Sequence, residues 1–283
     1  MSENAPYAEP LRLEPGIARV LARNPSPFTF TGTQSFVIGI DEVAVIDPGP
    51  DLPEHVAALE AAIGGRKVAA ILCTHTHRDH SPAARLLARS TGAPIVGCAP
   101  LTSDASGIEA GFDRDYRADR VLGDGEWVEV DGRRLIAVAT PGHTSNHLCF
   151  ADEASGALFS GDHVMGWSTS VVIPPDGSMA DYLASLEKLR GRDDRVFYPA
   201  HGEAVTNPQG FVRGLIGHRL SREKQILGLV GDGAGTVGAI VAAGYPALDA
   251  RLVPAAGASV LAHLIALEQR GSVTREGEQW RLA

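Results

Sequence analysis

The segment Thr74-His75-Thr76-His77-Arg78-Asp79-His80 decides the fold, because it joins an apolar run to a predicted helix. Residues 68–74 predict a buried strand, and residues 83–90 predict a helix that Ser81 caps and Gly92 ends. Three imidazoles and one carboxylate therefore lie at a strand end, facing a cleft. Such donors suit zinc, iron or manganese better than calcium or magnesium. The segment predicts a transition-metal site.

Three further segments repeat this arrangement. Apolar strands are predicted over residues 135–140, 157–160 and 196–200, and each runs into small or turn residues. A side chain that can bind a metal follows each strand; these side chains are His143, Asp162 and His201. Four strand ends with such donors, in this order, indicate one shared metal centre.

The remaining pattern predicts an α/β catalytic domain over residues 1–213. Asp131-Gly132 is a strong turn pair and predicts a hairpin between 127–130 and 135–140. Other elements expected in this domain are strands over 43–46 and 148–151, and helices over 53–63 and 179–190. Within the apolar segment 196–200, the strand itself is expected over 196–198. Three helices over 221–230, 236–243 and 259–269, followed by a hairpin at 276–278, predict a small winged-helix-like module over residues 214–283.

The donor set resembles the metallo-beta-lactamase superfamily, whose pattern is His-x-His-x-Asp-His followed by His, Asp and His. This resemblance implies an α/β fold, a four-layer αββα sandwich with the metals at one edge. It implies that a first metal is held by His75, His77 and His143. It implies that a second is held by Asp79, His80 and His201, and that Asp162 bridges the two.

Several other segments are similar to the beta-lactamase-like protein 2 branch of that superfamily. They are Pro27-Phe28-Thr29, Gly32-Thr33-Gln34-Ser35, Gly161-Asp162-His163-Val164-Met165, Tyr182 with Ser185-Leu186, and the winged-helix-like C-terminus. This branch and its neighbours include single-strand endoribonucleases and thioesterases, so the resemblance leaves the substrate open.

The resemblance implies a hydrolase with two divalent metal ions as cofactors. We expect zinc, with iron or manganese as alternatives. Two such ions lower the pKa of a shared water toward 7 and supply a metal-bridging hydroxide. Asp79 is the expected catalytic residue, which orients the nucleophile and moves its proton. A small ester, thioester or lactone is the expected substrate.

Further side chains near the motifs have weaker signals. His163 follows Asp162 directly, and Trp167 lies on a predicted loop nearby, so both are candidate substrate-binding residues. His147 is interpreted as a structural residue. The remaining histidines, His55, His218 and His263, fall in helical patterns and are interpreted as core or solvent-facing residues.

Composition restricts the compartment and the partners. The formal net charge of −9 disfavours nucleic acid and anionic membrane as partners, without excluding a local basic groove. No signal peptide or run of about 18 apolar residues is visible, so we expect a cytoplasmic protein that does not contact a membrane. Cys73, Cys98 and Cys149 are an odd number of thiols in apolar surroundings, which predicts free buried cysteines.

Other functions stay open at this point. The main alternative is a single-strand endoribonuclease with the same metal site, and a mononuclear iron persulfide dioxygenase is another. A metal-sensing DNA-binding regulator is the non-enzymatic alternative. Residues 214–283 hold seven Lys or Arg and six Asp or Glu, which is too balanced for a typical DNA-reading domain. Packing on the catalytic domain, forming a pocket wall or mediating a homodimer fits this module better.

Overall fold

The computed structural model describes residues 6–101 and 111–283, and the chain divides into two compact units. The first unit comprises Met1–Thr140, Asn146–Thr169 and Asp193–Pro208. The second unit comprises Pro141–Ser145, Ser170–Arg192 and Gln209–Ala283. Helix α4 spans Pro208–Gly231, so the expected boundary after residue 213 falls inside a helix. The division into 1–213 and 214–283 stays a prediction.

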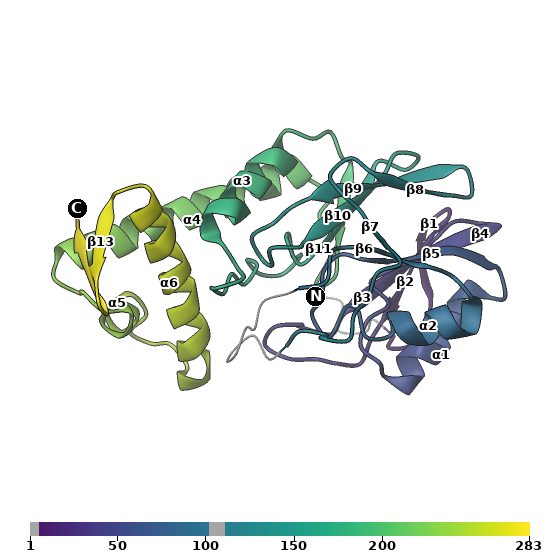
Figure 1. Ribbon diagram of the computed structural model, residues 1–283, viewed down its shortest axis with the longest axis horizontal. Helices are drawn as coiled ribbons and strands as arrows, with labels where there is room; N and C mark the ends of the chain where they lie inside the picture. Colours follow the sequence, from purple (N-terminus) through teal and green to yellow (C-terminus); the bar gives the residue numbers. More distant parts are fainter. Residues whose placement is uncertain (1–5, 102–110) are drawn as a thin grey trace. The chain divides into compact units, whose positions relative to one another are not determined.

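The first unit contains a seven-stranded sheet with strand order β1 to β7. Its strands are β1 (Leu11–Glu14), β2 (Ile17–Leu21), β3 (Gln34–Ile38), β4 (Glu42–Ile46), β5 (Lys67–Cys73), β6 (Ile95–Gly97) and β7 (Arg120–Val121). Neighbours are antiparallel from β1 to β4 and parallel from β4 to β7. Helices α1 (Pro53–Ile63) and α2 (Ala84–Thr91) supply the connections on either side of β5 and pack on this sheet (Figure 1).

The first unit also contains a five-stranded sheet, in the order β12-β11-β10-β9-β8. Its strands are β8 (Trp127–Val130), β9 (Arg133–Ala139), β10 (Leu148–Asp152), β11 (Ala157–Gly161) and β12 (Val196–Pro199). The predicted hairpin between β8 and β9 is present, and its turn residues Asp131 and Gly132 have φ of 53° and 74°. Two positive φ values match the right-handed twist of the flanking strands.

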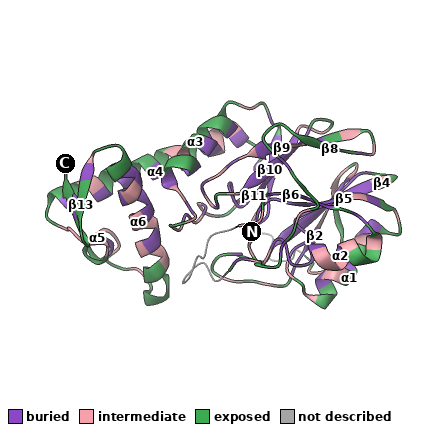
Figure 2. Cartoon of the chain, viewed as in Figure 1, coloured by how far each residue is buried: buried purple, intermediate pink, exposed green. Residues whose placement is uncertain are grey.

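The two sheets bury a shared apolar core. Phe36 of β3 contacts Phe159 of β11 with ring centroids 4.9 Å apart, and Tyr198 of β12 lies 6.0 Å from Phe36. Most side chains of β3, β4, β10 and β11 are buried, as the purple strands in Figure 2 show. Burial on both faces explains why these strands read as continuous apolar runs instead of alternating patterns.

The second unit is mainly helical. It contains α3 (Met179–Arg190), most of α4, α5 (Val237–Gly244), the short 3-10 helix Ala250–Leu252, α6 (Val253–Gln269), and the hairpin of β13 (Val273–Glu276) and β14 (Gln279–Leu282). The Ser178 and Thr236 side chains cap α3 and α5 by accepting backbone N–H groups. Ile226, Ile240, Leu264 and Trp280 belong to one apolar core, so α4, α5, α6 and the hairpin form the expected winged-helix arrangement.

Three expectations need correction. Ser81 does not cap α2, since its hydroxyl donates to Asp113 instead and the residue before α2 is Ala83. Helices α4 and α6 begin well before residues 221 and 259. The segment Ala250–Gln269, with mean hydropathy 1.6, is long and apolar enough to cross a membrane by length and composition alone, whereas no such run was expected. The buried side chains of α6 nevertheless pack in the apolar core just described, as in a core helix of a globular unit.

Candidate metal centre

The seven predicted donors lie where strands end, as the sequence indicates. The segment with His75, His77, Asp79 and His80 follows β5, and His143 follows β9. Asp162 follows β11 and His201 follows β12. Chain that has left a sheet no longer bonds to neighbouring strands, so side chains there can turn toward a common point. The structure gathers these donors into two groups.

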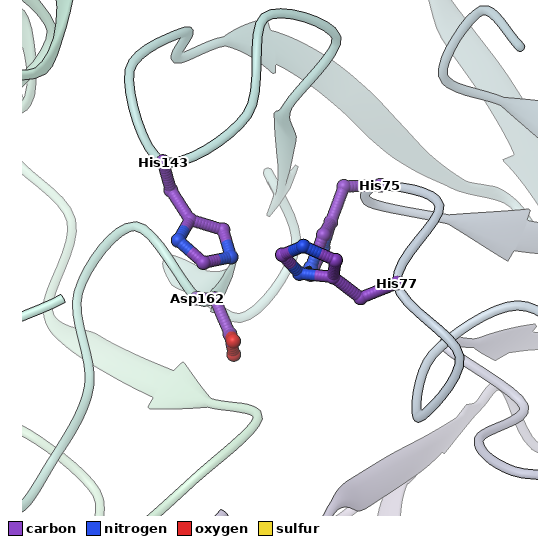
Figure 3. Close-up of side chains that lie close together, drawn as sticks. All are labelled: His75, His77, His143 and Asp162. Carbon is purple, nitrogen blue, oxygen red and sulfur yellow. Dashed lines mark hydrogen bonds between the residues drawn. The ribbon is translucent and has the colours of Figure 1, made fainter. Parts of the chain in front are cut away.

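The first group comprises His75, His77, His143 and Asp162, whose ligand atoms lie within 4.8 Å of one another. Figure 3 shows the four side chains close together, with the ring of His143 facing those of His75 and His77. His75 Nε2 lies 2.9 Å from His77 Nδ1. Because zinc–nitrogen bonds are about 2.0–2.1 Å long, one ion can reach both nitrogens.

The second group comprises Asp79, His80 and His201. Oδ2 of Asp79 lies 3.3 Å from Nε2 of His80 and 3.3 Å from Nε2 of His201. Oδ1 of Asp162 lies 3.5 Å and 3.1 Å from the same two nitrogens. Asp162 is therefore a member of the first group and a neighbour of the second, which is the position that a bridging carboxylate needs.

The outward-facing nitrogens of three histidines are fixed by hydrogen bonds to their other ring nitrogens. His80 Nδ1 donates to Asp47 Oδ2 at 2.9 Å, and His201 Nδ1 donates to the Gly32 carbonyl at 3.1 Å. His143 Nδ1 donates to the Val171 carbonyl at 2.6 Å. In the neutral ring, each bond leaves Nε2 as the deprotonated atom, which is how metal-binding histidines are oriented.

A test of fit comes from the buried atoms of the second group. His80 Nε2 is buried, and within the described part of the chain it has no hydrogen-bond partner. A buried polar atom without a partner costs free energy, unless a ligand or ion satisfies it. Imidazole nitrogens and carboxylate oxygens are donors that zinc, iron and manganese accept. The residues present therefore fit a divalent transition metal.

The charges of the second group depend strongly on one another. Burial alone would raise the pKa of Asp79 and of Asp162, but the neighbouring His80 and His201 hold both well below the usual carboxylate range. Burial alone would lower the pKa of His201, but Asp162 and Asp79 raise it to about 10. Both carboxylates therefore stay ionised beside two imidazoles, and a bound cation would take the place of the protons on these histidines.

Asp47 is the most important residue that the sequence reasoning missed as part of the site. Its carboxylate accepts the Thr74 backbone N–H and hydroxyl, both at 2.7 Å, in addition to the bond from His80. It therefore fixes the start of the motif segment and one ligand together. The only sequence signal was its place in Asp47-Pro48-Gly49, which reads as a strand stop.

Thr33 and His147 also support the site. Thr33 is buried and donates its hydroxyl to Asp79 Oδ2 at 2.9 Å, which orients the predicted catalytic carboxylate. His147 is buried, as interpreted from the sequence, and its Nε2 accepts the backbone N–H of Asp162 at 3.2 Å. Neither contact can be deduced from spacing, because each joins segments that meet only in the folded chain.

The two candidate substrate-binding residues lie in different surroundings. Trp167 is 38% exposed and stacks on Phe30, with ring centroids 4.9 Å apart and planes 14° apart. His163 is completely buried, with its ring 5.8 Å from that of His147, so it has no surface to offer a substrate in this conformation. Both assignments stay predictions.

The remaining residues singled out in the sequence are placed as follows. His55 and His263 are buried core residues, and His218 is exposed. His55 bonds to the Ser35 hydroxyl at 2.9 Å. The three cysteines are buried thiols, and within the described residues none of them forms a disulfide, as expected.

The chain belongs to the metallo-beta-lactamase superfamily, because the model of this family matches residues 28–201. The beta-lactamase associated winged helix domain matches residues 236–280. A metallo-beta-lactamase family protein from Thermus thermophilus has the same fold, with a TM-score of 0.79 at 24% identity, covering 96% of this chain and 100% of that one. The expected sandwich with a C-terminal winged helix is thereby confirmed.

Two relatives show which members of the superfamily this chain is similar to in sequence. A beta-lactamase-like protein 2 homolog from Caenorhabditis elegans is 30% identical over 234 residues, covering 78% of this chain and 73% of the relative. An atrochrysone carboxyl ACP thioesterase from Cryptosporiopsis sp. (strain 8999) is 30% identical over 225 residues, covering 78% of this chain. The chain spans 65% of that thioesterase, just under two thirds of its length. These similarities support a metal-dependent hydrolase.

Proposed function

We propose that this protein hydrolyses a thioester with an apolar acyl group, using two divalent metal ions held by the seven donors. The observation that carries the proposal is the placement of Asp162, which shares the first group and lies 3.1 Å from His201 of the second. Bound divalent cations would polarise the carbonyl and make a water molecule acidic near neutral pH. His75, His77 and His143 would hold one cation, Asp79, His80 and His201 the other, and Asp162 both.

Asp79 is the residue best placed to handle the proton of the attacking water. Its side chain is 24% exposed, whereas those of His80 and His201 are almost fully buried. The Thr33 hydroxyl donates to Oδ2 and fixes the carboxylate, which leaves Oδ1 to accept a proton from solvent. The proton passes from the water to this oxygen, and from there to the thiolate leaving group.

An aromatic pair supports the choice of an apolar acyl group. Phe30 is 40% exposed and Trp167 is 38% exposed, and the two rings stack. The pair borders the second group of donors, because Gly32, whose carbonyl accepts from His201, lies two residues from Phe30. Gly166, next to Trp167, donates its N–H to the His201 carbonyl at 2.9 Å. Exposed stacked rings give an apolar chain a surface to bury.

The relatives support the thioester bond in particular. One relative is named as a thioesterase that acts on an acyl carrier protein. The net charge of −9 counts against the alternative substrate, single-stranded RNA, whose phosphates need a positive groove. A thioester also has a good leaving group, so little is needed beyond carbonyl polarisation and an oriented water.

The test is a substrate panel with purified protein reconstituted with Zn²⁺. N-acetylcysteamine thioesters with acyl chains of two to about twelve carbons are compared with a short labelled single-stranded RNA. We expect thioester hydrolysis with kcat/KM rising with chain length, by up to about fourfold per added methylene if the chain is buried. Phe30→Ala and Trp167→Ala should flatten this rise and leave the rate on the acetyl thioester nearly unchanged. RNA cleavage without thioester hydrolysis would overturn the proposal.

A further inference from the structure

The turn that carries His143 belongs to the second unit, together with the chain that follows Thr169. His143 Nδ1 donates to the carbonyl of Val171 at 2.6 Å, so Val171 determines which way the imidazole faces. A ligand orientation set by one backbone carbonyl is only as well defined as the segment that contains the carbonyl. What holds residues 170–171 and 141–145 therefore matters for this donor.

Helix α3 holds the turn. Ser185 Oγ donates to the Pro141 carbonyl at 2.8 Å, and the N–H of Ser178 donates to the Gly142 carbonyl at 2.9 Å. Gly142 has φ of 136°, and a Cβ built on it would lie 2.3 Å from Tyr182 Cα. The turn thus packs directly on the helix backbone at Tyr182.

Arg219 of α4 contacts both the segment that contains residues 170–171 and Tyr182 of α3. It is 4% exposed, and its guanidinium donates to the carbonyl of Ser170, the residue before Val171. The same guanidinium lies 5.2 Å from the ring centroid of Tyr182. A buried cation is costly unless its surroundings satisfy it, and the contacts just described are with a neutral carbonyl and a neutral ring. Both contacts lead to the segments that set His143.

We propose that Arg219 is a positioning residue that fixes His143 as a metal ligand through the 170–171 backbone and Tyr182. This inference rests on the proposed function, because it assumes that His143 binds a cation. Loss of the Arg219 side chain removes one hydrogen bond to the Ser170 carbonyl, which lets the neighbouring Val171 carbonyl move and weakens the constraint on the imidazole. Arg219 itself does not bind the metal.

The experiment measures Zn²⁺ affinity by competition with a chromophoric chelator and the visible spectrum of Co²⁺-loaded protein. We expect Arg219→Met to weaken the Zn²⁺ site that contains His143 by about tenfold, the lower range for partners of metal ligands. Arg219→Lys, which keeps a donor for Ser170, should recover most of the affinity. The Co²⁺ spectrum should change in Arg219→Met and return toward wild type in Arg219→Lys.

Arg270→Met is the matched control. Arg270 forms an ion pair with Glu223 in the same unit, so its loss destabilises that unit without touching residues 170–171. It should lower the melting temperature and leave Zn²⁺ affinity unchanged. Repeating Arg219→Met in a His143→Ala background should give no further loss of affinity, because the ligand that Arg219 positions is gone.

Different outcomes would contradict the proposed function and the proposed role of Arg219. Failure of the wild-type protein to bind Zn²⁺ would contradict the proposed function. Normal Zn²⁺ binding by the wild type, with equal affinity in Arg219→Met, would overturn only the role of Arg219. An equal loss in the wild-type and His143→Ala backgrounds would also overturn it, since Arg219 would then act through general stability.

Discussion

His80 Nδ1 donates to Asp47 Oδ2 at 2.9 Å, and this bond decides which nitrogen of His80 faces the other donors. The same carboxylate accepts two bonds from Thr74, the first residue of the motif segment. One buried side chain on the β4–α1 turn therefore fixes both the segment and the ligand. The site depends on such supporting residues as much as on the donors themselves.

Asp47→Asn should weaken metal binding by about 10- to 100-fold without unfolding the protein. An amide would present an N–H group to Thr74 or to His80, where each now meets an accepting oxygen. Asp47 has φ of 46°, a conformation that asparagine also tolerates, so the change tests the side chain and not the backbone. Zn²⁺ titration measures the effect. The exposed Asp51→Asn is the control, and equal affinities in the two variants would contradict this role.

Asp79→Ala and Asp162→Ala should each lower kcat by at least about a thousandfold. The first removes the residue that orients the water, and the second removes the carboxylate that both groups share. Initial rates of thioester hydrolysis at saturating Zn²⁺ measure this loss. Asp193→Ala, an exposed carboxylate outside the site, should keep wild-type rates. Full activity in either site variant would refute the assignment of that residue.

Gly142→Ala should destabilise the protein by more than about 1 kcal/mol, because the position has a positive φ and its Cβ would overlap Tyr182. Gly217→Ala is the matched control. Gly217 lies inside α4 with nothing within 4 Å of an added Cβ, so alanine there should stabilise the helix by about 0.5–1 kcal/mol. Urea unfolding measures both changes in the free energy of unfolding. A change of the same sign in the two variants would contradict the overlap between a Cβ at Gly142 and Tyr182.

His263 should make the folded state sensitive to acid. Its side chain is completely buried, and burial, with Arg219 and Arg222 nearby, lowers its pKa to about 3 from an ordinary 6.5. Between pH 6.5 and 3, the His263 side chain therefore binds a proton in the unfolded chain but stays neutral in the folded chain. The free energy of unfolding is therefore unaffected by protonation of His263 above pH 6.5. As the pH falls from 6.5 toward 3, protonation of His263 in the unfolded chain lowers that free energy by up to about 1.4 kcal/mol per pH unit.

The corresponding measurement compares urea unfolding of wild type and His263→Leu between pH 7.5 and 4.5. The variant should lose less stability than wild type as the pH falls. His218→Leu, at an exposed position on α4, should follow wild type more closely. A parallel pH dependence of wild type and His263→Leu would mean that His263 takes up protons equally in both states.

The meeting of these seven side chains was predictable from sequence because each follows an apolar strand, and strand ends in one layered fold meet at one edge. His75 and His201, although 126 positions apart in the chain, could thus be assigned to one site by this pattern. The β8–β9 hairpin was also predictable, since Asp131-Gly132 has few conformations available. Local chemistry is enough wherever neighbours in sequence are neighbours in space.

The supporting contacts were not predictable, because they join distant segments. Thr33 meets Asp79 only after β3 and β5 have joined one sheet, and Arg219 meets Ser170 only after α4 has packed. Ser81 looked like a helix cap, but a tertiary partner, Asp113, takes its hydroxyl. Helix α4 begins before the predicted residue 221 because Pro208 at its first position favours helix initiation. The glycines in the first half of the helix have low helix propensity, so the sequence pattern did not indicate this start.

Two bound metal ions that drive thioester hydrolysis are tested most directly by the metal content of the purified protein, measured with its thioesterase activity before and after chelation. We predict about two divalent transition-metal ions per chain, loss of both metal and activity with a chelator, and recovery of both with Zn²⁺. We also predict that His75→Ala together with His201→Ala abolishes metal retention. A protein that retains no metal at neutral pH, or that hydrolyses thioesters equally well after chelation, would contradict the proposed function.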